Sequence, residues 1–270
     1  MWSPPVGALG ALTDEARVRA ATLSGRTAEL KQLAANARDA PSLLAALRQK
    51  TVSVIAEVKR SSPSKGSINP GLELSGQVRA YETGGAAAIS VLTEPTRFGG
   101  SIEDLVEARG LVRVPLLKKD FHVEAVQIIE ARGLGASAAL VIARAVPPAK
   151  LAELMHAAEV VGIELLVEVR DERELNLALS LGASMIGINN RNLETLEIDP
   201  ETSLRVLPLV PREVVAVAES GIKSARDVER VAQAGADAVL VGSELSASRN
   251  PENAVRALTG IQRRNGAREG

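Results

Sequence analysis

Charged residues that could do chemistry stand at the ends of short apolar runs. In SVIAEVKRSSPSKG (53–66), Glu57 and Lys59 lie two positions apart within a run that is typical of a buried strand. Side chains at i and i+2 point to the same side of a strand, so the two charges share one face while Val58 points the other way. That face must do something other than pack into an apolar core.

The same pattern recurs along the chain. The residues that end the later runs are Lys118, Lys119 and Asp120; Glu168; Asn189, Asn190 and Arg191; Glu219, Ser220 and Gly221; and Gly242 and Ser243. Taken singly, each is explained as well by a solvated strand end or a structural ion pair. Partly buried charges lose hydration unless they are paired, so the coincidence of so many favours a functional site.

Lysines and glutamates gathered in one place suit acid–base catalysis. Burial or a neighbouring cation lowers the pKa of a lysine, and burial raises the pKa of a glutamate. Lys119 and Glu168 are therefore the candidate proton donor and acceptor. Lys118 and Arg60 directly neighbour Lys119 and Lys59 in sequence, so they point to the opposite side and face helices or solvent.

Eight apolar runs of strand length provide the elements that must position these residues. The runs are 53–59, 87–93, 114–120, 138–144, 163–169, 184–190, 214–220 and 237–243. Longer segments with helical spacing separate them, as in buried parallel strands joined by crossover helices. Eight such units predict an α/β fold, the (β/α)8 TIM barrel, rather than an open doubly wound sheet of five or six strands.

A glycine precedes every second run, and residues 1–50 precede them all. The glycines are Gly85, Gly135, Gly182 and Gly235. Each lies where a helix ends, at a position that favours the left-handed conformation of a helix cap. Residues 1–50 contain no strand-like run, and their helical spacing, with Thr13 as an N-cap, predicts extra helices ahead of the barrel. We expect residues 1–270 to form a single domain.

Two turns have the features of a phosphate site. In a barrel of this kind the active site lies at the carboxyl ends of the strands, and the last two loops commonly bind phosphate. ESGI (219–222) and VGSE (241–244) place small residues with free backbone N–H groups there, and glycine lets the backbone approach an anion closely. One such turn alone is also an ordinary strand-to-helix connection, but two neighbouring turns strengthen the prediction.

The composition excludes several classes of function. A formal net charge of −1 gives no bulk attraction to nucleic acid or anionic membrane, and four aromatic residues are too few for a base-stacking surface. The absence of cysteine excludes disulfides, thiolate metal sites and cysteine nucleophiles. His122 and His156 are far apart in sequence, and each is predicted to lie on the surface or in a helix. The chain shows neither a signal peptide nor a long apolar span, so we expect a cytoplasmic protein.

Six motifs together resemble a known family. IAEVKRSSPSKG, LLKKDF, LLVEV, INNRNLETLEID, VAESGI and LVGSELS occur in this order from about residue 8 to about residue 260, and they closely resemble indole-3-glycerol-phosphate synthase. The resemblance implies a (β/α)8 enzyme of tryptophan biosynthesis. It would close the ring of 1-(2-carboxyphenylamino)-1-deoxyribulose 5-phosphate and release carbon dioxide and water, without a metal ion or an organic cofactor.

The resemblance also implies catalytic roles. Lys119 would be the general acid that protonates the ribulose carbonyl as the aromatic carbon attacks it, and Glu168 the base of the later dehydration. Lys59 would hold the substrate carboxylate and, in some accounts, share the work of the acid. The other expected catalytic residues are Glu57, Asn189 and Glu219. The first two would orient these groups and the sugar hydroxyls.

Substrate-binding residues follow from the same resemblance. The residues expected to hold the phosphate are Ser62, Ser64, Arg191, Ser220, Gly221, Gly242 and Ser243. The apolar residues expected around the anthranilate ring, called the ring wall below, are Pro63, Phe98, Phe121, Leu140 and Leu193. For the two phenylalanines, simple core packing is the alternative. His122 and Leu196 depart from the family pattern, and we expect both to reshape the ring wall slightly.

Two other functions stay open at this point. A sugar-phosphate or aminoaldose isomerase would need an acid and a base but neither a carboxylate-binding lysine nor a ring wall. A non-catalytic barrel that binds a phosphorylated ligand would need no acid or base. We expect a phosphorylated small molecule as substrate, no nucleic acid or membrane as partner, and a monomer or homodimer. The residues alone leave open which of Lys59 and Lys119 first donates a proton.

Overall fold

Eight parallel strands close into a barrel in the computed structural model, which describes residues 2–264 and residue 268. The strands are β1 (Ser53–Val58), β4 (Ala88–Leu92), β5 (Leu116–Lys119), β6 (Ala138–Ile142), β7 (Glu164–Val169), β8 (Met185–Asn189), β9 (Val215–Glu219) and β10 (Ala238–Val241). They follow one another around the barrel in chain order, and β10 pairs with β1. Each of the eight predicted runs contains one of them, so the predicted (β/α)8 barrel is confirmed.

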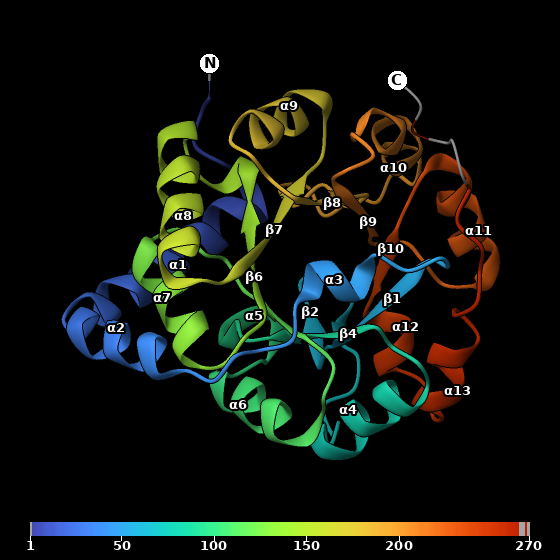
Figure 1. Cartoon of the computed structure of the whole chain (residues 1–270), viewed down its shortest axis with the longest axis horizontal. Helices are drawn as coiled ribbons and strands as arrows, with labels where there is room; N and C mark the ends of the chain where they lie inside the picture. The colour runs from blue at the N-terminus through green and yellow to red at the C-terminus, as the bar shows by residue number, and fades with distance from the viewer. Residues whose placement is uncertain (1, 265–267, 269–270) are drawn as a thin grey trace.

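Helices follow the strands and surround the barrel (Figure 1). The main ones are α4 (Leu74–Thr83), α6 (Ile102–Leu111), α7 (Ala125–Gly133), α8 (Pro148–Val161), α9 (Glu172–Ser180), α10 (Glu201–Val206), α11 (Ala225–Ala234) and α13 (Pro251–Arg256). Shorter elements are α5 (Pro95–Phe98), α12 (Ser243–Ser246), the 3-10 turns Ala143–Ala145 and Leu207–Leu209, and the ribbon of β2 (Ser61–Ser62) and β3 (Gly66–Ser67). Among the described residues, no helix combines the length and apolar character of a membrane span.

The four glycines predicted as helix caps adopt the left-handed conformation. Their φ angles are 93° at Gly85, 83° at Gly135, 85° at Gly182 and 108° at Gly235. A side chain would strain the backbone at these positions, whereas glycine turns freely from the helix into the next strand. The prediction from the repeated sequence pattern is therefore confirmed.

Three helices precede the barrel, as predicted: α1 (Gly7–Ser24), α2 (Thr27–Asn36) and α3 (Leu43–Leu47). Ser42, just before α3, donates a hydrogen bond of 2.5 Å to Glu164, the first residue of β7, so α3 covers the amino end of the barrel. Figure 1 looks onto this end, with α3 in front of the centre. Leu12 and Leu43 belong to the same apolar core as the strands, and we infer from this shared core that the chain forms one domain.

The prediction of Thr13 as an N-cap is wrong. Helix α1 begins at Gly7, and Thr13 is buried inside it, where its hydroxyl donates a hydrogen bond of 2.8 Å to the Gly10 carbonyl. The apolar contacts of Leu9 and Leu12 with the barrel extend the helix beyond the local cap signal, because packing outweighs a capping preference of about 1 kcal/mol.

Two basic residues, Lys118 on β5 and Arg60 just after β1, pair with helices. The Lys118 ammonium lies 2.8 Å from the Glu130 carboxylate of α7, and Arg60 pairs with Asp104 of α6 at 2.5 Å. Both residues therefore point away from the barrel interior, as the strand alternation predicts.

The prediction of a surface or helix position for His122 is wrong, whereas His156 lies exposed on α8. His122 is buried beyond the end of β5, and its Nδ1 lies 2.6 Å from the Leu140 carbonyl oxygen. Burial and the neighbouring Lys118 lower the pKa of His122 to about 3, so the imidazole is neutral. A sequence does not show that the first residues after a strand turn back onto the strand and its neighbour, as His122 does with Lys118 of β5 and Leu140 of β6.

Removing one partner of the buried Lys118–Glu130 pair should destabilise the protein. Lys118→Met leaves the Glu130 carboxylate buried without its cation, which costs about 3 kcal/mol in the free energy of unfolding. Urea denaturation measures this loss, and the double variant Lys118→Met/Glu130→Leu should regain most of it. A single variant within about 0.5 kcal/mol of the parent would mean that the pair is not sealed from water.

Candidate active site

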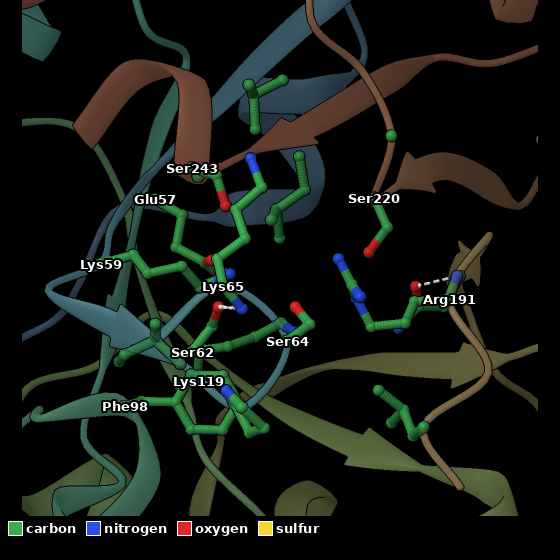
Figure 2. Close-up of a pocket in the computed structure, with 18 of the residues that line it drawn as sticks. Glu57, Lys59, Ser62, Ser64, Lys65, Phe98, Lys119, Arg191, Ser220 and Ser243 are labelled. Carbon is green, nitrogen blue, oxygen red and sulfur yellow. Dashed lines mark hydrogen bonds and ion pairs between the residues drawn. The ribbon is translucent and has the colours of Figure 1, made fainter. Parts of the chain in front are cut away.

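A cavity of about 180 Å³ opens at the carboxyl end of the barrel. The predicted site residues that line it are Glu57, Lys59, Ser62, Pro63, Ser64, Phe98, Lys119, Phe121, Leu140, Glu168, Asn189, Arg191, Leu193, Ser220, Gly221, Gly242 and Ser243. Figure 2 shows the labelled members around one space, with Glu57 and Lys59 on one side and Ser220 and Arg191 on the other. Of the predicted residues, only Glu219 is not part of the lining, because it lies deeper in the barrel beneath Lys119.

Lys119 is the centre of the polar part of the cavity. Its Nζ lies 3.5 Å from Glu219 Oε2 and 3.6 Å from Glu168 Oε2. Burial would lower the pKa of Lys119, but the carboxylates of Glu219, Glu168 and Glu57 outweigh it and raise the pKa above its ordinary value. The expectation that crowding weakens the proton affinity of this lysine is therefore wrong. Lys119 is held as an ammonium, which is the form that a proton donor needs.

Glu57 and Lys59 form the second ion pair of the site. Lys59 Nζ lies 2.6 Å from Glu57 Oε1, and Ser90 donates a hydrogen bond of 3.3 Å to Glu57 Oε2. Burial would raise the pKa of Glu57, but Lys59 and Lys119 overcome this and lower it. Lys59 Nζ also lies 5.8 Å from the centre of the Phe98 ring. The two charges thus share the inner face of the barrel, as their spacing predicts.

Asn189 orients Glu168. Its side-chain amide donates a hydrogen bond of 2.8 Å to Glu168 Oε1 and accepts one of 2.9 Å from the backbone N–H of Arg191. Within the described residues, Glu168 Oε2 has no hydrogen-bond partner, and this oxygen faces Lys119. A buried carboxylate oxygen left open beside an ammonium is suited to accept a proton.

Glu219 is the third carboxylate. Burial raises its pKa to about 8; Lys119 acts in the opposite direction, while Glu168 and Glu57 add to the rise. Two glycines make room for the buried carboxylates, since a Cβ on Gly187 would collide with Glu219 Oε1 and a Cβ on Gly242 with Glu57 Oε1. Gly242 is therefore needed to leave space for the Glu57 carboxylate, in addition to its predicted role in phosphate binding.

The predicted phosphate residues meet at the ends of β9, β10 and the first loop. Ser220 and Gly221 both adopt positive φ angles, 65° and 82°, in a turn that exposes the backbone toward the cavity. Gly242 precedes α12, whose first N–H groups have no partner within the helix. In the first loop, the Ser62 hydroxyl accepts a hydrogen bond of 3.2 Å from the Lys65 backbone N–H. Burial lowers the pKa of Arg191, and a guanidinium stays charged in proteins.

The ring wall forms the apolar side of the cavity. Phe98 and Phe121 lie with their ring centres 6.2 Å apart and their planes tilted by 39°. Both line the cavity, so core packing alone does not account for them. Leu196 lines it too, with a φ of 67°, and its carbonyl accepts a hydrogen bond of 2.7 Å from Arg191. His122 does not line it; it follows Phe121 in the chain, and its Nδ1 lies 2.6 Å from the carbonyl oxygen of Leu140.

Sequence reasoning missed several residues of the lining. These are Leu12, Lys65, Leu92, Ile142, Ile198, Ile222, Lys223, Leu240, Val241 and Glu244. The lining also includes Asp120, predicted as a strand-end residue, and Leu196, predicted to reshape the ring wall. Lys65 directly follows Ser64, an expected phosphate residue, and Lys223 directly follows the ESGI turn. Their positive charge was a signal that could have been used. Leu12 belongs to α1, and no local pattern tells where a helix ahead of the barrel packs. Within the described residues, no group of three or more His, Asp or Glu side chains could hold a metal ion.

Comparison with known proteins identifies the family. The family model described as indole-3-glycerol phosphate synthase matches residues 11–258. Indole-3-glycerol phosphate synthase 1 of Streptomyces coelicolor is 50% identical over 230 residues, which cover 85% of this chain and 86% of that protein. Indole-3-glycerol phosphate synthase of Parafrankia sp. is 46% identical over 231 residues, or 86% of each chain.

Solved structures with lower identity share the fold. For 3-hexulose-6-phosphate synthase from Salmonella typhimurium the TM-score is 0.61 at 17% identity, covering 77% of this chain and 96% of that one. For thiamine phosphate pyrophosphorylase from Pyrococcus furiosus it is 0.58 at 18% identity, covering 78% and 95%. These likenesses show the barrel alone. The family match, the curated relatives and the cavity agree, and the chain belongs to the indole-3-glycerol phosphate synthase family, decarboxylating lyases of tryptophan biosynthesis.

Proposed function

We propose that this cavity closes the indole ring of 1-(2-carboxyphenylamino)-1-deoxyribulose 5-phosphate, with Lys119 as the acid and Glu168 as the base. The observation that carries the proposal is the position of the Lys119 ammonium between the carboxylates of Glu168 and Glu219, 3.6 and 3.5 Å away. One polar cluster thus holds a proton to give and an open oxygen to receive one.

The two ends of the cavity suit the two ends of the substrate. The phosphate would lie against Ser220, Gly221 and the start of α12, where backbone N–H groups are available to an anion. The aromatic ring would lie against Phe98 and Phe121. Lys59 Nζ is near the face of the Phe98 ring, so a carboxylate on a ring stacked there would come within reach of this ammonium.

Ring closure would begin with the proton of Lys119. The ring carbon that bears the carboxylate attacks the ribulose carbonyl, a carbon–carbon bond forms, and the carbonyl oxygen takes the proton to become a hydroxyl. Loss of carbon dioxide leaves its electron pair in the ring and restores aromaticity. An ammonium fixed in a dry site stabilises the developing negative charge on the oxygen before the proton is transferred.

Dehydration would then complete the indole. Lys59, which the family resemblance gives a share of the acid's work, would protonate the new hydroxyl, and this leaves as water. Glu168 removes the proton from the neighbouring carbon, so that a double bond forms. Asn189 holds one oxygen of Glu168 and leaves Oε2 open for this task. Glu57 keeps Lys59 in place. Glu219 does not line the cavity; its carboxyl, whose pKa burial raises to about 8, would act by positioning the Lys119 ammonium 3.5 Å away.

An assay on the purified protein tests the proposal. With the carboxyphenylamino sugar phosphate as substrate, we expect a rise in indole fluorescence together with one carbon dioxide per product. Isomerisation of a sugar phosphate without carbon dioxide, or tight binding without turnover, would favour one of the two other functions; no observation on the described residues favours either. A cytoplasmic location, independence from cofactors, and a monomeric or homodimeric state stay predictions.

Lys119→Ala should remove most of the turnover. Because general acid catalysis contributes about 100-fold or more, we expect kcat to fall by at least that factor. Circular dichroism should show an intact barrel, and Lys31→Ala, a change of an exposed lysine on α2, serves as the control. A kcat near that of the parent enzyme would remove Lys119 from the mechanism.

Glu168→Gln should stall a late step while substrate still binds. The amide oxygen of glutamine can still accept the hydrogen bond from Asn189, but the amide cannot act as a base. Quenched-flow experiments should detect carbon dioxide release before indole formation, with an intermediate that accumulates. If indole appears as fast as carbon dioxide and no intermediate builds up, another group must be the base.

The pH dependence of stability should report Glu219. Between the ordinary pKa of 4.5 and about 8, the folded state holds a proton that the unfolded state has lost, so stability falls as the pH rises. The limiting slope is about 1.4 kcal/mol per pH unit. From pH 5.5 to 7, the unfolding free energy of the parent should therefore decline more steeply than that of Glu219→Gln. Parallel declines in urea denaturation would show that Glu219 is ionised.

A further inference from the structure

One face of α1 lies against the mouth of the barrel. Leu12, Glu15 and Arg19 follow one another at i, i+3 and i+7, a spacing that places them on the same side of a helix. Leu12 lines the cavity, Glu15 lies 3.2 Å from Arg97 of α5, and Arg19 reaches the ends of β4 and β5. The extension therefore contacts the site at three successive turns.

Arg19 pairs with Asp120, which lies between Lys119 and Phe121 in the chain. Arg19 donates a hydrogen bond of 2.7 Å to Asp120 Oδ1, which also accepts the Phe121 backbone N–H at 2.8 Å. Asp120 Oδ2 accepts the Thr93 hydroxyl at 2.6 Å. This buried carboxylate thus fixes the backbone of Phe121 and joins the end of β5 to the residue that follows β4.

The second carboxylate near Arg19 holds Phe98. Arg19 Nη1 lies 3.6 Å from Glu94 Oε1, and Glu94 is fully buried. The Glu94 carboxylate accepts the backbone N–H groups of Thr96, Arg97 and Phe98 at 2.9, 2.7 and 3.0 Å, so it caps the short helix α5. The placement of the Phe98 ring depends on this cap.

We propose that Arg19 is a positioning residue for the ring wall: its guanidinium bridges Asp120 and Glu94 and thereby sets the spacing of Phe121 and Phe98. The inference rests on the proposed function in so far as this wall receives the anthranilate ring. A planar guanidinium can serve two carboxylates at once, whereas a lysine ammonium offers a single point of charge. Lys118, on the outer side of β5, and His122, beyond the end of β5, also act on Asp120, but no hydrogen bond or ion pair joins either of them to Glu94 among the described residues.

Binding of two probes separates this role from a general effect on the fold. Anthranilate should occupy the ring wall, and inorganic phosphate the other end of the cavity, beside Ser220 and Ser243. Isothermal titration on Arg19→Ala should show anthranilate affinity reduced about tenfold, which corresponds to about 1.4 kcal/mol, and phosphate affinity within twofold of the parent. KM for the sugar phosphate substrate should rise.

Two further variants sharpen the test. Arg17→Ala is the matched control, because Arg17 lies on the same helix and pairs only with the exposed Asp14 among the described residues. It should leave both affinities unchanged. Arg19→Lys should recover part of the anthranilate affinity, and guanidinium at about 20 mM, far below denaturing concentrations, should restore anthranilate binding to Arg19→Ala but not alter Arg17→Ala.

The proposal is overturned if Arg19→Ala binds anthranilate as the parent does, or if both probes weaken equally and guanidinium restores neither. Should Arg19→Ala fail to fold, Arg19→Lys decides: anthranilate affinity equal to that of the parent contradicts a bridge between two carboxylates. Because binding is measured directly, these outcomes do not depend on turnover. If the parent enzyme forms no indole, the proposed function is wrong. The bridging role of Arg19 would still be tested by the same titrations.

Discussion

The site depends on one balance of charge inside the barrel. Three carboxylates, of Glu57, Glu168 and Glu219, surround two ammonium groups in a place from which water is largely excluded. Two ion pairs account for two of the carboxylates, and a third negative charge would be costly to bury. The raised pKa of Glu219 resolves this, because its carboxyl keeps a proton at neutral pH. Glu219, once it ionises above about pH 8, and the carboxylates of Glu168 and Glu57 keep the proton on Lys119 against the effect of burial.

Much of the site could be predicted because a parallel barrel turns positions in the sequence into positions in space. All eight strands end at one mouth, so a charge at the end of a run belongs to the site wherever it stands in the chain. Strand alternation likewise predicted that Lys119 and Lys59 point into the barrel, whereas Lys118 and Arg60 point outward. The left-handed glycines before alternate strands followed from the same local reasoning.

The rest depends on distances and packing that no local pattern contains. Burial lowers the pKa of Lys119 and three carboxylates raise it. The net direction depends on the distances from these carboxylates to the ammonium. The contacts of Leu12 and Arg19 depend on where α1 packs. The buried position of His122 depends on its contacts with Lys118 of β5 and the Leu140 carbonyl of β6. Nothing in the sequence distinguishes Gly187 from any other glycine in a strand. Only the structure shows that the carboxylate of Glu219 occupies the space that a side chain at Gly187 would need.

The helical extension is part of the site as well as of the fold. It shares the apolar core, covers the amino end of the barrel with α3, and sends α1 to the opposite, carboxyl end. Through Arg19 it holds two buried carboxylates that fix the backbones of Phe98 and Phe121. Apolar packing holds α1 against the barrel, and α1 in turn holds the residues that shape the cavity.

The protonation state of Lys119 is the most direct measure of this account. Carbon-13 NMR of protein labelled at lysine Cε, with the Lys119 signal identified by its loss in Lys119→Ala, would follow the titration of this one amine. The charge balance predicts a signal that keeps its ammonium shift up to the ordinary lysine pKa of 10.5 and beyond. A Lys119 signal that titrates between pH 7 and 9 would contradict it, because the carboxylates would then not govern the proton on which the proposed chemistry begins.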